Sequence, residues 1–112
     1  MSFIILPKQL FFDPKFKKLS VEAKVLYALL SDRTSLSKEN GSAWMDKNGQ
    51  YFVYFPQAEV MRYFACSHDK ATSLMRELEF VGLIQCKRQG LGRPRRIFVN
   101  TTMVDAEKKH SV

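Results

Sequence analysis

The sequence predicts one α+β domain with a three-helix core, a short strand and a C-terminal β-hairpin. Two helical segments, at about 57 to 64 and 67 to 81, are separated by only a few residues, which is typical of a helix-turn-helix. A β-prone hairpin with two glycines at its tip follows directly. An aromatic and valine-rich run at 51 to 55 precedes the pair and predicts a short strand. The order of helix, strand, helix, helix and hairpin is that of a winged helix-turn-helix.

The length and composition indicate one compact core. The chain has 112 residues, and 46% of them are hydrophobic. We expect one domain over residues 1 to 100, beginning with an N-terminal arm at 1 to 19. Residues 101 to 112 are mostly polar and are expected to be a flexible tail, or the start of a linker to a C-terminal domain that this chain lacks.

The N-terminal arm is predicted from its prolines. Pro7 and Pro14 prevent one continuous helix across residues 3 to 16. The arm and its end carry four basic residues, Lys8, Lys15, Lys17 and Lys18. Only Asp13 opposes them. These lysines could contact phosphates or form an ordinary solvated surface, and the sequence leaves both interpretations open.

The first core helix is predicted by its cap and its apolar spacing. Ser20 is a suitable N-cap, and the apolar positions that follow at helical spacing are Ala23, Leu26, Tyr27 and Leu30. The stretch from 32 to 48 is polar and rich in turn signals. It is expected to be a loop held in place by Trp44.

The last helix before the hairpin is the candidate recognition helix. Ser67 is its predicted N-cap and Gly82 its predicted stop, and its core side is formed by Leu74, Met75, Leu78 and Val81. The candidate contacts to DNA are its first turn and its opposite face, namely Ser67, His68, Lys70, Thr72, Ser73 and Arg76.

The chemistry of this face suits base recognition. Arg76 could read guanine through two parallel hydrogen bonds, and Thr72 could contact a thymine methyl group. A simply solvated helix face is the alternative. Phe80 falls on the same polar side and either packs under the wing or marks a partner surface.

The hairpin concentrates the positive charge. The net charge of +7 comes from 18 Lys and Arg against 11 Asp and Glu, yet no acidic residue lies between Phe80 and Val104. Five basic residues of that stretch are the candidate wing contacts, Lys87, Arg88, Arg93, Arg95 and Arg96. Removing these five charges from +7 would leave +2. The charge favours double-stranded DNA as the partner, with RNA or an acidic protein as alternatives.

No enzymatic machinery is expected. The chain contains no convincing nucleophile–base pair, carboxylate pair or glycine-rich phosphate loop, and no cofactor is expected. Cys66 and Cys86 lack zinc-ligand spacing, so no metal site is expected either, and they suit a reducing cytoplasm. No membrane span or signal peptide is recognisable.

Several segments in fixed order resemble one family. They are LSVEAKVLYALLSDRTSLS at 19 to 37, WMDKNGQYFVYF at 44 to 55, CSHDKA at 66 to 71, LMRELEFVGLI at 74 to 84 and KRQGLGRPRRIFV at 87 to 99. Over about residues 3 to 99 the chain resembles the N-terminal domain of plasmid replication initiator protein A from Gram-positive bacteria.

The resemblance implies a winged helix that forms a homodimer and binds repeated double-stranded sites at a plasmid origin. It also implies a separate C-terminal domain, absent here, through which host replication proteins could be contacted. A transcriptional repressor on the same scaffold is the nearest alternative, and a protein-interaction winged helix without DNA binding is another. A nuclease would require carboxylates gathered from Asp32, Asp46 and Glu59.

Overall fold

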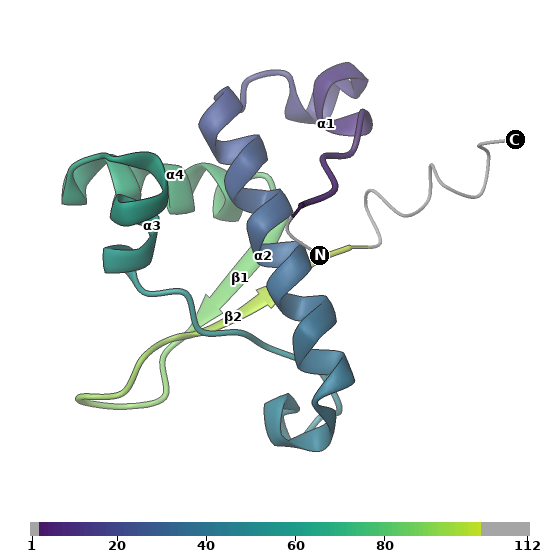
Figure 1. The fold of residues 1–112 in the computed structure, drawn as a ribbon, viewed down its shortest axis with the longest axis vertical. Helices are drawn as coiled ribbons and strands as arrows, with labels where there is room; N and C mark the ends of the chain where they lie inside the picture. Colours follow the sequence, from purple (N-terminus) through teal and green to yellow (C-terminus); the bar gives the residue numbers. More distant parts are fainter. Residues whose placement is uncertain (1–2, 102–112) are drawn as a thin grey trace, which may run out of the picture.

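The computed structural model describes residues 3–101 as one layer of helices packed on a small sheet (Figure 1). The elements in order are α1 (Gln9–Phe12), the 3-10 helix η1 (Pro14–Phe16), α2 (Val21–Glu39), the 3-10 helix η2 (Gly41–Trp44), α3 (Gln57–Phe64), α4 (His68–Phe80), β1 (Ile84–Lys87) and β2 (Arg96–Val99). This is the predicted α+β winged helix-turn-helix. The tail expected at 101 to 112 lies, apart from Thr101, outside the described residues.

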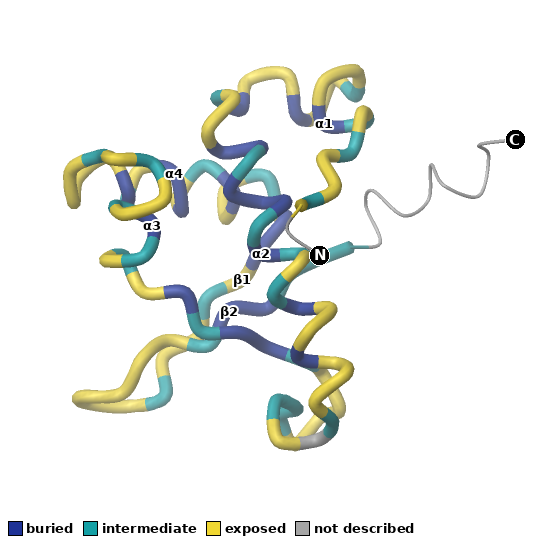
Figure 2. Tube along the Cα trace, viewed as in Figure 1, coloured by how far each residue is buried: buried dark blue, intermediate teal, exposed yellow. Residues whose placement is uncertain are grey.

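The helix α2 runs through the centre of the fold. Its Ala23, Leu26 and Leu30 are fully buried in a cluster with α3, α4 and the hairpin. Figure 2 shows this buried stripe along α2, in contrast with the exposed loop between β1 and β2. The spacing that predicts the helix is therefore also the spacing that buries it.

The helix α2 is much longer than the sequence predicts. The loop expected from 32 to 48 is wrong in its first part, because α2 continues to Glu39 and η2 follows. Thr34 and Ser37 are buried within this extension, and their hydroxyls donate to the carbonyls of Leu30 (2.9 Å) and Arg33 (3.2 Å). Polar side chains thus bond to their own helix, which a count of turn-forming residues does not reveal.

The N-terminal segment that we expected to be an arm is packed on the core. Leu10 and Phe16 are fully buried in the main cluster. The Nζ atom of Lys24 in α2 lies 4.4 Å from the centre of the Phe11 ring. Asp13 caps η1 by accepting from the backbone N–H of Lys15 (3.0 Å). The lysines of this segment therefore stand on an ordered support.

The two strands form an antiparallel hairpin in which Ile84 pairs with Val99 and Lys87 with Arg96. The strand expected at 51 to 55 is present as extended chain with only isolated bridges. Val53 pairs with Ile97 through two backbone hydrogen bonds of 2.9 Å each, so this segment lies along β2. The sheet is thus a hairpin with a third, minimal strand.

A second apolar cluster covers the sheet face that points away from the main core. Phe52 and Phe98 are buried with ring centres 6.0 Å apart. Trp44 packs edge-on against Phe52 at 6.1 Å and Tyr54 at 5.6 Å. The expected anchoring role of Trp44 is confirmed, although it anchors a helical turn instead of a loop.

The helix-turn-helix has the predicted boundaries. α3 ends at Ala65, whose φ of 49° is left-handed and turns the chain sharply toward α4. The Ser67 hydroxyl caps α4 by accepting from the N–H of Lys70 (3.2 Å), and Gly82 ends it with a φ of 83°. The predicted core side of α4 is confirmed, since Leu74 and Leu78 are fully buried.

Replacing Leu78 with alanine should lower the free energy of unfolding by about 2 to 5 kcal/mol, because it leaves a cavity between α4 and α2. Ser73→Ala, at an exposed position of the same helix, is the matched control and should change it by less than about 0.5 kcal/mol. Denaturant melts of both variants provide the test. Equal stability of the two would contradict the helix phase described above.

Candidate nucleic-acid interface

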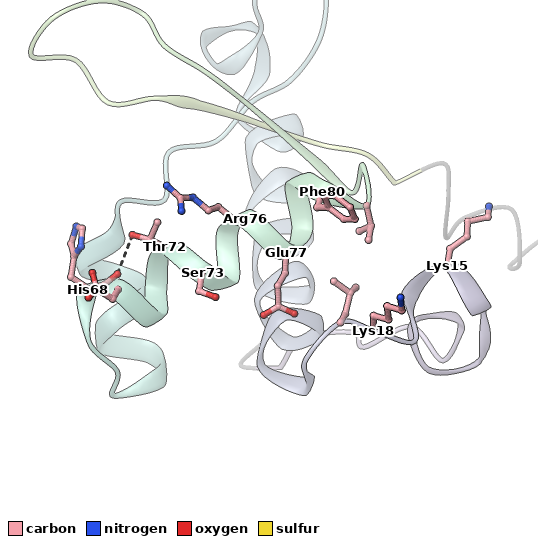
Figure 3. A pocket seen from close by; sticks show the side chains of 11 residues that line it. Lys15, Lys18, His68, Thr72, Ser73, Arg76, Glu77 and Phe80 are labelled. Carbon is pink, nitrogen blue, oxygen red and sulfur yellow. Dashed lines mark hydrogen bonds between the residues drawn. The ribbon is translucent and has the colours of Figure 1, made fainter.

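The outward face of α4 is the first part of the interface. His68, Ser73 and Arg76 are exposed, so their side chains are accessible to a partner. Figure 3 shows Arg76 directed toward the wing side of the helix. Their exposure is compatible with the predicted contact to DNA, which stays a prediction.

The other three candidates on α4 already have structural contacts. Ser67 is the N-cap, as described above. The Nζ atom of Lys70 lies 3.8 Å from a carboxylate oxygen of Glu22 in α2, a half-exposed pair of small energy. Thr72 donates to the carbonyl of His68 (3.1 Å) and accepts from the side-chain amide of Gln57. Thr72 therefore joins α4 to α3, and its hydroxyl hydrogen is already used within the domain.

A groove of about 760 Å³ runs along the outward face of α4. One wall is α4 itself, and the other comes from the N-terminal segment (Figure 3). The lining residues are Lys15, Lys18, Leu19, His68, Asp69, Thr72, Ser73, Arg76, Glu77, Phe80 and Val81. Four of the six predicted recognition-helix residues therefore share one groove.

Some groove residues were absent from the predicted site. Asp69 and Phe80 lie at the centre of the outward face, and the helical spacing that selects Arg76 also selects them. Phe80 is 91% exposed, which excludes packing under the wing and leaves the partner surface as its interpretation. Lys15 and Lys18 reach the groove only through the folding of the N-terminal segment.

A carboxylate fixes the two walls of the groove relative to each other. The backbone N–H of Ser20 donates to one oxygen of Glu77 (2.7 Å), and the Ser20 hydroxyl donates to the other (2.9 Å). Both oxygens of Glu77 are therefore engaged, and its charge is directed to the start of α2. Glu77 therefore connects the two walls of the groove through its hydrogen bonds to Ser20.

The wing divides its five cations into two groups. Lys87 and Arg96 lie over aromatic rings, with Nζ of Lys87 5.2 Å from the centre of Phe98 and Cζ of Arg96 4.6 Å from the centre of Phe52. The remaining three are exposed around the loop: Arg88, Arg93 and Arg95. Arg96 is half-buried on its ring, whereas Lys87 is exposed and, like the three loop arginines, accessible to a polyanion.

The wing tip is tethered at its base. The side-chain amide of Gln89 donates to the Tyr54 hydroxyl (3.0 Å) and to the carbonyl of Pro94 (2.8 Å). Beyond this tether, Gly92 has a φ of 76°, which closes the loop, and Leu91 is fully exposed. The tether fixes where the loop leaves the aromatic cluster.

Cys86 is half-buried in β1, and its thiol is harder to ionise than a free cysteine. Desolvation, reinforced by the charge of Glu79 and opposed by that of Arg95, raises the pKa of its thiol to about 11. Cys86 is thus neutral at physiological pH.

Within residues 3–101, no group of side chains could hold a metal ion, and no helix is long and apolar enough to cross a membrane.

Gln89→Ala should increase amide hydrogen exchange in residues 90 to 95, because both contacts of the tether are lost. Tyr54→Phe removes only one of them and should produce a smaller increase. Hydrogen exchange read by mass spectrometry distinguishes the two variants. Exchange equal to that of the unmodified protein in Gln89→Ala would show that the tether does not order the loop.

A helix-turn-helix with an accessible outer helix and a basic hairpin defines a winged-helix domain of the type found in nucleic-acid-binding proteins. The chain belongs to the family of replication initiator protein A (RepA) N-termini, whose model matches residues 2–112. The family resemblance noted in the sequence is therefore confirmed.

The chain is also similar to a curated bacterial protein. A "41 kDa protein" of Lactobacillus helveticus is 29% identical over 84 residues, which are 75% of this chain. The match covers 23% of that protein, so the chain spans about a quarter of its curated relative.

Two solved structures share the fold over nearly the whole chain. The first, an "N-Terminal domain of DNA binding protein", has a TM-score of 0.74 at 31% identity and covers 96% of this chain and 83% of its own. The second, a "Structure of Rep-DNA complex", has a TM-score of 0.73 at 29% identity and covers 97% and 87%.

Proposed function

We propose that this chain is the domain of a plasmid replication initiator that binds double-stranded DNA sequence-specifically at repeated origin sites. The observation that carries the proposal is the pairing of two accessible surfaces on one domain. They are the outward face of α4, with Arg76, and a tethered loop with three exposed arginines. The family of the chain and the Rep–DNA complex among the similar structures support it.

In this proposal α4 enters the major groove and the wing follows the adjacent backbone or minor groove. Arg76 donates two hydrogen bonds to a guanine, with Ser73 and His68 beside it. Arg88, Arg93 and Arg95 bind phosphates and supply affinity that does not depend on sequence. The domain has no catalytic role, metal or cofactor of its own.

The larger assembly is proposed from the family. Two copies bind as a dimer, the cytoplasm is the site of action, and contacts to host replication proteins belong to parts of the initiator outside this chain. A transcriptional repressor remains the second candidate, since the same surfaces would serve it. Repeated sites favour an initiator, and a single palindrome favours a repressor.

Selection from a random duplex pool at about physiological salt tests the proposal, because non-specific binding is weak there. Enrichment of a motif that recurs in an origin would support it. Failure to enrich any motif, with no duplex binding at low salt, would contradict DNA binding and favour a protein-interaction domain.

Arg76→Ala should relax the preference at one base pair, with a loss of about 1 to 3 kcal/mol of discrimination, because a bidentate base contact is removed. A binding assay over all single-base variants of the selected site gives the profile. A profile with the same preference at every position would exclude Arg76 from base recognition.

Arg93→Ala combined with Arg95→Ala should weaken binding to all duplexes and reduce the magnitude of the negative slope of log K against log salt by about 1 to 2, since each phosphate contact contributes about −0.9 to that slope. Arg96→Ala is the contrasting variant. Because Arg96 lies over Phe52, its loss should lower stability more than it changes the slope. Unchanged slopes in the double variant would place the wing away from DNA.

A further inference from the structure

The groove beside α4 has a basic wall that neither the recognition helix nor the wing explains. Lys15 and Lys18 are exposed on the N-terminal segment and line the groove near the end of α4 that carries Glu77 and Phe80 (Figure 3). None of the salt bridges within residues 3–101 involves either lysine. Both ammonium groups are thus available to an anion from outside the chain.

Three acidic residues lie in the groove or beside these lysines: Asp13, Asp69 and Glu77. Glu77 is held by Ser20, as described above. Asp13 accepts from the Lys15 backbone N–H and the Gln9 side chain, and these hydrogen bonds are the main reason that its pKa lies below the usual value. Asp69 is the remaining acidic residue of the groove, and it lies in the first turn of α4, beside His68.

The position of the lysines matches the shape of a duplex. Figure 3 shows α4 between the wing on one side and Lys15 and Lys18 on the other. A helix in the major groove has a phosphate backbone on each side of it. If the wing serves one backbone, the second backbone runs past the N-terminal segment.

We propose that Lys15 and Lys18 bind the phosphate backbone on the side of α4 opposite the wing, so that the domain holds DNA from both sides of the recognition helix. This inference rests on the proposed DNA-binding function and extends it to a site on the N-terminal segment.

The two lysines are held in place by buried residues next to them in the chain. Leu19 is buried directly after Lys18, and Phe16 is fully buried directly after Lys15. Ser20 connects this segment to Glu77 of α4. The two lysines are therefore held at a defined position beside α4, where a bound phosphate adds affinity for any duplex.

The test compares two double variants with the same change of charge. Lys15→Ala with Lys18→Ala removes the groove lysines, whereas Lys8→Ala with Lys17→Ala removes two exposed lysines of the same segment that do not line the groove. Binding to the selected site and to an unrelated duplex is measured from low to high salt, with thermal melts to confirm equal folding.

The Lys15→Ala, Lys18→Ala variant should reduce the magnitude of the negative slope of log K against log salt by about 1 to 2. It should also weaken binding by about tenfold or more at low salt, equally for both duplexes. The control should keep the slope of the unmodified protein. Placing neutral methylphosphonates along each strand should further show one backbone position whose substitution weakens the unmodified protein but not the Lys15/Lys18 variant.

Equal slopes in the two double variants would overturn the inference, while a slope reduced in magnitude by Arg93→Ala with Arg95→Ala would leave the proposed DNA-binding function standing. Absence of duplex binding by the unmodified protein would overturn both. A Lys15/Lys18 variant with an unchanged slope, combined with lost self-association in Phe80→Ala, would assign the groove to a second copy of the chain.

Discussion

The arrangement of the interface depends on the contact between Glu77 and Ser20. A half-buried carboxylate needs donors, and Ser20 supplies two of them while its hydroxyl also caps α2 by accepting from the N–H of Ala23 (3.1 Å). The N–H and hydroxyl of Ser20 and the carboxylate of Glu77 thus connect the start of α2, the end of the N-terminal segment and α4. The spacing between α4 and that segment is consequently set by short, directional hydrogen bonds, which tolerate less variation than apolar packing does.

Much of the fold follows from local signals in the sequence. The boundaries of α4 were predictable because they depend on local interactions. Ser67 caps the N–H of Lys70 three residues later, and Gly82 ends the helix through its own positive φ. The extension of α2 was not, since Thr34 and Ser37 are compatible with both helix and loop until their hydroxyls find a backbone carbonyl. The packing of the N-terminal segment was also hidden, because its apolar residues acquire partners only from α2 and the rest of the core.

The sequence was sufficient to predict which face of α4 points outward, but not which side chains of the candidate site already have partners within the domain. Apolar spacing determines which face of α4 is outward, and the structure agrees with it. Whether a cation of α4 or of the wing is available to a partner depends on residues far away in the chain. Lys70 meets Glu22 and Arg96 meets the Phe52 ring, while Arg76 and Arg93 remain exposed. Only the tertiary structure separates supporting cations from available ones.

The two apolar clusters have a consequence for how this domain changes over time. α4 rests on the main core, whereas the hairpin loop rests on the separate cluster of Trp44, Phe52, Tyr54 and Phe98. Substitutions that reshape the loop need not disturb the packing beneath the helix, and the reverse also holds. On the proposed function, changes in the loop would alter the strength of DNA binding, and changes on the outward face of α4 would alter the preferred sequence. The fold allows these two traits to diverge at different rates.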